Sequence, residues 1–152
     1  MKIGVISDTH GLLRPEVIEN LQGCQQILHA GDINKREILN ELQRIAPVRV
    51  VRGNNDTDWA ADIPYKLEFE LDGVRVLICH KKSDLPKNPE NADLVVFGHS
   101  HKYEDKQVGA VRWLNPGSCG PRRFHQDITM ALLEVEGGVI KDVQRIDIPH
   151  TV

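Results

Sequence analysis

The sequence predicts an α/β protein built from two stacked β-sheets with helices on the outside. Over residues 2–52, short runs rich in Val and Ile alternate with helix-like segments, an order typical of a parallel sheet covered by helices. The rest of the chain reads almost entirely as strands. About nine strands and two or three helices are expected in total. A single sheet of that size would leave one face uncovered, which favours two sheets packed together.

Three strands and two helices are expected in the N-terminal part. Pro15 suits the first turn of one helix, and Pro47 ends the other. The second helix places Ile38, Leu39 and Leu42 on one face at helical spacing. The expected strands cover residues 2–7, 26–30 and 48–52, and the helices cover residues 15–21 and 35–46.

Hairpins and isolated strands are expected in the C-terminal part. Residues 65–71 alternate apolar and charged side chains, and a turn at Asp72-Gly73 returns the chain as a strand over residues 74–79. A second pair of strands is expected at residues 128–136 and 139–148, joined at Gly137-Gly138. Two further strands are expected at residues 94–97 and 111–114.

Size and composition are those of one globular domain, expected over residues 1–152. Hydrophobic residues make up 40% of the chain and charged residues 27%, with a formal net charge of −3. This balance provides no general basic field for nucleic acid. No apolar run approaches the roughly 18 residues of a membrane span, and the first residues do not resemble a secretory signal. Three scattered cysteines are typical of reduced, buried thiols, so we expect a cytoplasmic protein with no membrane partner.

Five of the expected strands end in polar side chains of the kinds that bind metals. These side chains are Asp8 and His10, then Asp32, then Asn54 with Asn55 and Asp56, then His80, and finally His99 and His101. In α/β sheets, ligands bind outside the carboxyl ends of the strands. Each residue alone could be a turn, a cap or a structural histidine. Together, three Asp or Asn oxygens and four imidazoles suit Mn, Fe, Ni or Zn, and they predict a metal site.

The motifs D-x-H, G-D, G-N-x-D, H and G-H-x-H resemble those of the calcineurin-like metallophosphoesterases, most closely the small stand-alone phosphodiesterase subgroup. The resemblance runs from Asp8 to residues 115–118. It implies a four-layer α/β/β/α sandwich of two mixed sheets, the fold of metallo-dependent phosphatases. This agrees with the two sheets expected from the strand count.

The resemblance also implies a dinuclear centre and a ligand set. Asp32 would bridge two divalent ions, with manganese expected and nickel, iron, zinc or cobalt as alternatives. One ion would be held by Asp8, His10 and His101, and the other by Asn54, His80 and His99. The implied reaction is phosphodiester hydrolysis by in-line attack of a hydroxide that bridges the two ions.

The expected partners are a small phosphoester substrate and, as an option, a second copy of the chain. Neither a membrane nor a nucleic acid is expected, except for a small nucleotide as substrate. Two other functions remain open at this point. One is a phosphomonoesterase with the same chemistry. The other is a weakly catalytic or non-catalytic metal-binding scaffold for protein interaction, for which the small retromer subunit is a precedent with this fold.

The chain departs from the family pattern beside the predicted ligands. Asn55 stands where many members have His, or often Cys in the small subgroup, so it could hydrogen-bond a phosphoryl oxygen but not act as a general acid. Asp56 would support Asn55. Alternatively, Asn55 and Asp56 would only shape the turn. Gly53, the residue before Asn54, is expected to allow a sharp bend. Lys81 follows His80 where Gly is common. Lys81 and Arg122 could each bind phosphate or be solvated surface charges.

Overall fold

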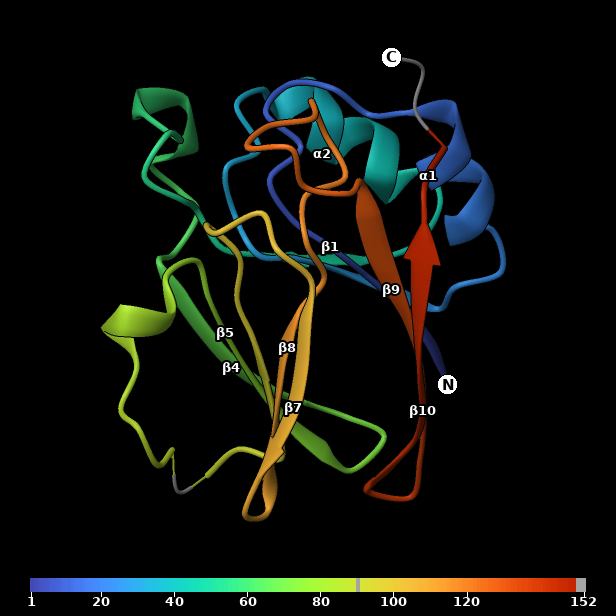
Figure 1. The fold of residues 1–152 in the computed structure, drawn as a ribbon, viewed down its shortest axis with the longest axis vertical. Helices are drawn as coiled ribbons and strands as arrows, with labels where there is room; N and C mark the ends of the chain where they lie inside the picture. Colours follow the sequence, from blue (N-terminus) through green and yellow to red (C-terminus); the bar gives the residue numbers. More distant parts are fainter. Residues whose placement is uncertain (90, 150–152) are drawn as a thin grey trace.

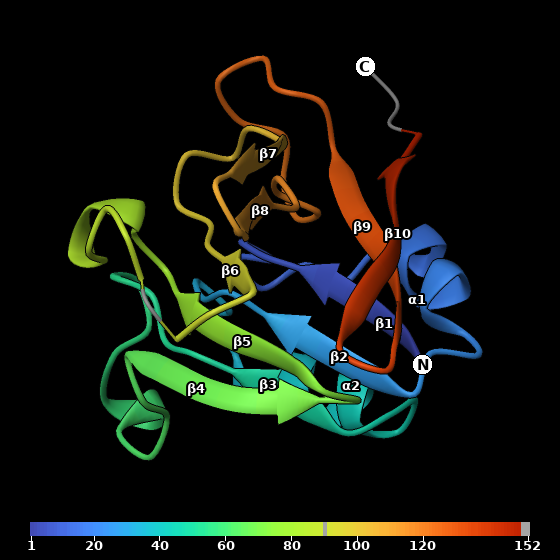
Figure 2. The ribbon, with the colours of Figure 1, turned by 90° about the horizontal axis from the view of Figure 1, so that it is seen from below.

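Two five-stranded mixed sheets pack face to face, with their strands forming separate layers in Figure 2. The computed structural model describes residues 1–89 and 91–149. The first sheet has the order β10-β9-β1-β2-β3 and the second the order β4-β5-β6-β8-β7. The α/β sandwich of two mixed sheets predicted from the sequence is therefore confirmed. Residues 90 and 150–152 of the predicted domain lie outside the described residues.

The elements of the first sheet follow the predicted β-α-β-α-β order and then return at the C-terminus (Figure 1). Its strands β1, β2 and β3 run parallel, while β9 and β10 form an antiparallel hairpin beside β1. The bounds are β1 Lys2–Ile6, α1 Pro15–Leu21, β2 Gln26–His29, α2 Arg36–Gln43, β3 Val48–Val50, β9 Thr129–Glu136 and β10 Val139–Asp147.

The second sheet is built from one hairpin and two parallel strands with a further antiparallel edge. Strand β5 pairs antiparallel with β4 and parallel with β6, and β8 pairs parallel with β6 and antiparallel with β7. The bounds are η1 Asp58–Ala60, β4 Lys66–Leu71, β5 Val74–Cys79, η2 Lys82–Asp84, β6 Leu94–Val96, β7 Glu104–Val108 and β8 Val111–Asn115, where η marks a short 3₁₀ helix.

Both α-helices cover the same face of the first sheet. Crossovers between parallel strands are right-handed, and β1, β2 and β3 lie in sequential order, so both crossover helices must lie on one side. Leu21 of α1 and Leu42 of α2 are fully buried there against Ile6 and Ile27 of the sheet. The opposite face of this sheet packs on the second sheet through residues such as Val5.

The outer face of the second sheet is covered by the segment around η2. Leu85 packs there against a cluster that contains Val95, Phe97 and Trp113. The fourth layer of the sandwich is therefore a short 3₁₀ turn with its loop.

One strand was not expected from the sequence. Strand β7 reads EDKQV and is mostly exposed, because it forms an edge of the second sheet. Its backbone pairs with β8, from Glu104 opposite Asn115 to Val108 opposite Val111. Charged residues at an exposed edge discourage pairing with other chains, but they erase the apolar alternation by which a strand is recognised.

Cys24, Cys79 and Cys119 are buried free thiols, as the cysteine spacing predicted. Among the helices of the described ranges, none has both the length and the apolar character needed to cross a membrane.

Candidate metal site

The predicted ligands come together at one edge of the sandwich because they follow the carboxyl ends of parallel strands. In the first sheet they follow β1, β2 and β3, which run in the same direction. In the second sheet they follow β5 and β6, which are also parallel to each other. The two sheets are joined at this point by a hydrogen bond from the His99 backbone N–H to Asp8 Oδ2 at 3.1 Å.

Backbone hydrogen bonds fix the loops that carry the predicted ligands. Beyond the ends of β1 and β2, the Asp8 N–H donates to the Gly31 carbonyl and the His10 N–H donates to the Asp32 carbonyl, each at 2.9 Å. In the second sheet the Gly98 N–H donates to the His80 carbonyl at 2.9 Å. The loops that carry the predicted ligands thus continue the backbone hydrogen bonding of the sheets.

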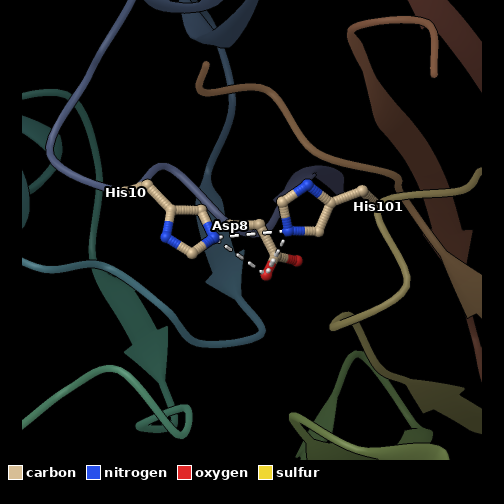
Figure 3. A group of neighbouring side chains, drawn as sticks. All are labelled: Asp8, His10 and His101. Atoms are coloured by element: carbon tan, nitrogen blue, oxygen red, sulfur yellow. Dashed lines mark hydrogen bonds and ion pairs between the residues drawn. The ribbon is translucent and has the colours of Figure 1, made fainter. Parts of the chain in front are cut away.

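A first group of side chains consists of Asp8, His10 and His101 (Figure 3). His10 Nε2 lies 3.3 Å from His101 Nε2, and Asp8 Oδ1 lies 3.6 Å from His10 Nε2 and 3.4 Å from His101 Nε2. Ligand atoms about 2.1 Å from a common ion stand roughly 3.0–3.4 Å apart. The triangle is therefore close to the size that one divalent cation requires.

A second group consists of Asp32, His80 and His99, whose ligand atoms lie within 4.8 Å of one another. Asp32 Oδ2 is 3.1 Å from His80 Nε2 and 3.7 Å from His10 Nε2, so it faces both groups. Asp8 Oδ1 is likewise 3.8 Å from His80 Nε2. The two groups are therefore adjacent, and each carboxylate lies within 4 Å of a histidine of the other group.

Two buried atoms in this arrangement fit a cation. Asp8 Oδ1 and His80 Nε2 are buried and have no hydrogen-bond partner among the described residues, whereas buried polar atoms are normally paired. His80 Nδ1 donates to the Ala30 carbonyl at 2.7 Å, which leaves the lone pair on Nε2, facing Asp32. A carbonyl that fixes the tautomer in this way is the usual support for a metal-binding histidine. The donor set therefore suits a divalent ion.

Electrostatic interactions keep the two carboxylates ionised. Burial alone would raise the pKa of Asp8, but the neighbouring His10 and His101 rings hold this pKa well below its usual range. The pKa of Asp32 is also lowered, because His80 and the Asn55 backbone N–H outweigh the effect of burial. Conversely, Asp32 outweighs the burial of His80 and raises its pKa. Two buried carboxylates charged at neutral pH are a strong attractor for cations.

The backbone of the ligand loops is strained. Five of the predicted ligands, Asp8, His10, Asp32, His99 and His101, have φ values between 45° and 75°. This left-handed region is uncommon for residues other than glycine, and such residues cluster at functional sites, where surrounding structure holds them. The strain shows that these side chains are held in position by the fold.

Asn54, Asn55 and Asp56 have three different environments after β3. Asn54 is exposed and lies with His80 in the wall of a small cavity. The Asn55 backbone N–H donates to Asp32 Oδ1 at 2.9 Å and its side-chain amide donates to Asp32 Oδ2 at 3.2 Å. Asn55 thus orients the carboxylate that faces both groups. Its role toward a phosphoryl oxygen stays a prediction.

Asp56 is buried and ties together the loops after β2 and β3. Its Oδ1 accepts backbone N–H bonds from Ile33 at 2.9 Å and Asn34 at 2.8 Å. Its Oδ2 accepts from Gly53 at 2.9 Å. Asp56 therefore supports the positions of Asp32 and Asn54 through the backbone.

Gly53 is required for close approach, and not for the sharp bend expected from the sequence. Its φ is not among the positive values, but a Cβ at this position would collide with the Asp32 carboxylate and lie 2.6 Å from the Asp32 backbone nitrogen. A side chain at residue 53 would displace the central carboxylate.

The two predicted phosphate-binding residues differ in position. Lys81 is half-buried and lies in the cavity wall with Asn54 and His80. Burial and the charge of His80 lower the pKa of His99, and the charge of Lys81 adds to this effect. Arg122 is exposed, and its guanidinium donates to the carbonyls of Gln126 at 3.2 Å and His125 at 3.5 Å within its own loop. A phosphate contact for either residue stays a prediction.

Two residues near the site were not identified from the sequence. The Ser7 hydroxyl donates to Asp8 Oδ2 at 2.7 Å and fixes the orientation of that carboxylate. The Phe124 ring lies edge-on to His101, with ring centroids 5.5 Å apart. Ser7 carries no signal, whereas Phe124 is an isolated aromatic residue in a polar segment, a weak signal that the strand-end argument did not use.

The fold and the site define a metallophosphoesterase-like protein with candidate ligands for metal ions. The sequence pattern of the calcineurin-like phosphoesterase superfamily domain matches residues 1–138, and the chain belongs to this family. A relative named probable metallophosphoesterase, from Methanothermobacter thermautotrophicus, is 34% identical and aligns over 90% of this chain and 87% of its own length.

Two solved structures are similar to this chain in fold. A structure described as a novel archaeal phosphodiesterase is 27% identical, with a TM-score of 0.82, and the match covers 97% of this chain and all of that one. Vps29 from Entamoeba histolytica, solved in complex with zinc, is 24% identical with a TM-score of 0.75 over 97% of this chain and 99% of that one. This second similarity concerns the fold alone.

Proposed function

We propose that this protein is a metal-dependent phosphoesterase that hydrolyses small phosphodiesters at a dinuclear centre. The observation that carries the proposal is the pair of adjacent side-chain groups that meet at Asp8 and Asp32. Membership in the calcineurin-like phosphoesterase superfamily supports a hydrolase. The similarity to a solved phosphodiesterase supports the diester preference.

In this proposal each group would hold one ion, and Asp32, which faces both groups, would serve both. Asp8, His10 and His101 would hold the first ion, because their ligand atoms form the triangle of 3.3–3.6 Å. His80 and His99 would hold the second, together with Asn54. The mixture of carboxylate, amide and imidazole ligands suits Mn²⁺, which we propose as the ion, although the same ligands accept Ni, Fe, Zn or Co.

Two divalent ions, when bound, activate a water as the nucleophile and offset negative charge on the phosphoryl oxygens. The residues of the chain hold this arrangement in place. The Ala30 carbonyl orients His80, Asn55 and the Asp56-bound loops orient Asp32, and Ser7 orients Asp8. Because these partners are preformed, little reorganisation is needed when substrate binds.

Asn55 and Lys81 explain the proposed preference for diesters. Asn55 is 3.2 Å from Asp32 Oδ2 and is a neutral amide, so it can donate a hydrogen bond to the substrate but cannot protonate a leaving group. General acid assistance is worth about 10²–10⁴-fold, so poor leaving groups should react slowly. A diester carries one negative charge, for which the Lys81 ammonium, in the cavity wall with Asn54 and His80, is a counterion.

The test is an assay of the purified full chain on bis(p-nitrophenyl) phosphate and p-nitrophenyl phosphate with added Mn²⁺ or Ni²⁺. We expect the diester to be hydrolysed faster than the monoester, and a chelator to abolish the activity. Asp32→Ala should remove activity and lower the amount of bound metal, whereas Asp58→Asn, an exposed carboxylate change in η1, should alter neither.

Other outcomes select among the alternatives. Turnover that resists chelation, or full activity in Asp32→Ala, would contradict the dinuclear mechanism. Faster hydrolysis of the monoester would indicate a phosphomonoesterase. Stoichiometric metal without turnover of either ester would indicate a metal-binding scaffold. Metal analysis of the protein as isolated tests the assignment of manganese.

A further inference from the structure

Phe124 is an exposed aromatic residue at the edge of the candidate metal site. It has 71% of its surface exposed, more than any other large hydrophobic side chain of the described residues. Its ring stands at 71° to the ring of His101, with centroids 5.5 Å apart. Because His101 Nε2 lies 3.4 Å from Asp8 Oδ1 and 3.3 Å from His10 Nε2, Phe124 lies one side chain away from the centre of the site.

The loop of Phe124 is held in an unfavourable conformation. Phe124 and His125 both have a φ of 56°, and a left-handed backbone is a genuine outlier for a bulky residue. The Arg122 guanidinium donates to the carbonyls of His125 and Gln126, and the Gln126 N–H donates to the Arg123 carbonyl at 3.0 Å. These bonds close the loop on itself and keep the Phe124 ring out in solvent, beside His101.

Tyr65, another exposed aromatic residue near the predicted ligands, has less free ring surface. Tyr65 is 62% exposed and lies in the wall of the cavity that contains Asn54 and His80. The Arg52 guanidinium stands 4.0 Å above its ring centroid and covers one face. Phe124 thus offers the larger free aromatic surface next to the predicted ligands.

We propose that Phe124 is a stacking platform for a planar aromatic group on the substrate, and that the preferred substrates are phosphodiesters with an aryl or nucleoside substituent. This inference rests on the proposed phosphodiesterase function and specifies its substrate class. Aromatic rings and nucleobases stack on such a surface without sequence or hydrogen-bond readout.

In-line displacement indicates which substituent Phe124 contacts. The oxygen of water forms a bond to phosphorus and its proton is released to solvent, while the P–O bond to the leaving group breaks and the electron pair leaves with the departing oxygen. The attacking and leaving oxygens lie on one axis, and the other substituents lie around it. When the water attacks from the side of the buried Asp8 and Asp32 carboxylates, the leaving group departs toward solvent and the retained ester projects sideways across the rim. Phe124 stands at this rim, and the monoester product therefore keeps the stacked group.

The kinetic experiment compares three diesters that share the p-nitrophenolate leaving group. Their retained groups are methyl, phenyl and 5′-thymidyl, so that aryl and nucleoside sources of the aromatic ring are distinguished. In Phe124→Ala we expect kcat/KM to fall about fivefold to tenfold for the phenyl or thymidyl ester. For the methyl ester we expect less than a twofold change. Phe124→Trp should restore the preference, and Tyr65→Ala should leave the ratio of phenyl to methyl ester unchanged.

A binding experiment separates this inference from the proposed function. Titration calorimetry of the manganese-loaded full chain would compare phenylphosphonate with methylphosphonate. We expect tighter binding of phenylphosphonate, and loss of the difference in Phe124→Ala. That result without any diester turnover would refute the proposed function and leave the stacking platform standing. Equal losses for all three diesters, loss of preference in Tyr65→Ala alone, or no phosphonate discrimination would overturn the platform.

Discussion

Replacement of Asp56 by Asn should destabilise the protein and weaken metal binding, although Asp56 is not a predicted ligand. The buried Asp56 carboxylate accepts three short backbone hydrogen bonds, from Ile33, Asn34 and Gly53, at 2.8–2.9 Å. In Asp56→Asn one oxygen becomes an NH₂ group, so at least one backbone N–H faces another donor. This substitution tests whether the loops after β2 and β3 are held together by one side chain.

The magnitude follows from the number of bonds affected. A hydrogen bond to a charged group contributes about 1.5–3 kcal/mol, and an orphaned buried donor costs about 1–3 kcal/mol. The neutral amide also removes the desolvation cost of a buried charge. We therefore expect a loss of about 2 kcal/mol for Asp56→Asn and about 4 kcal/mol for Asp56→Ala, which strands all three donors. For a chain of this length, 2 kcal/mol lowers Tm by about 4–8 °C.

The assay is urea unfolding with chelator present, so that lost metal affinity does not add to lost stability. Asp58→Asn is the matched control, because Asp58 is exposed and two residues away. A separate titration with Mn²⁺ should show about tenfold weaker binding in Asp56→Asn, as for other supports of metal ligands. An Asp56→Asn protein that unfolds within about 0.5 kcal/mol of the Asp58→Asn control would refute this reasoning.

Three further predictions concern other residues of the site and its support. Gly53→Ala should reduce both activity and bound metal, measured by assay and metal analysis, because its Cβ meets the Asp32 carboxylate; unchanged metal content would contradict this. Burial lowers the pKa of His29 to about 4, so the unfolded chain binds the extra proton between pH ~6.5 and 4. The stability that depends on His29 being buried in its neutral form is therefore fully present above pH ~6.5. It falls by about 2 kcal/mol when the pH is lowered to 5. Unfolding curves of His29→Gln should lack this pH dependence, and a parallel dependence in both proteins would count against it. Ser7→Ala removes the hydroxyl donor to Asp8 Oδ2 and should lower kcat/KM about tenfold with the fold intact by circular dichroism; activity equal to that of the unchanged protein would assign Ser7 no positioning role.

The strand ends show how the sequence predicted that the candidate metal ligands lie close together. Asp8, Asp32 and His80 each lie within three residues of the end of a buried apolar strand, and local patterning is enough to locate such strands. Parallel strands deliver their carboxyl ends to one edge, so proximity of these side chains followed without coordinates. Strand β7 was missed because its exposed, charged edge sequence carries no apolar alternation.

The sequence by itself determined the two-sheet sandwich and the set of side chains able to bind metal, because both depend on apolar periodicity and on residues adjacent to it in the chain. The tertiary structure alone decided how those side chains are held. Asp56 spans two loops, Gly53 makes room for Asp32, and Phe124 stands beside His101. These contacts join residues more than twenty positions apart through specific side-chain directions, and no local pattern of the sequence encodes such directions.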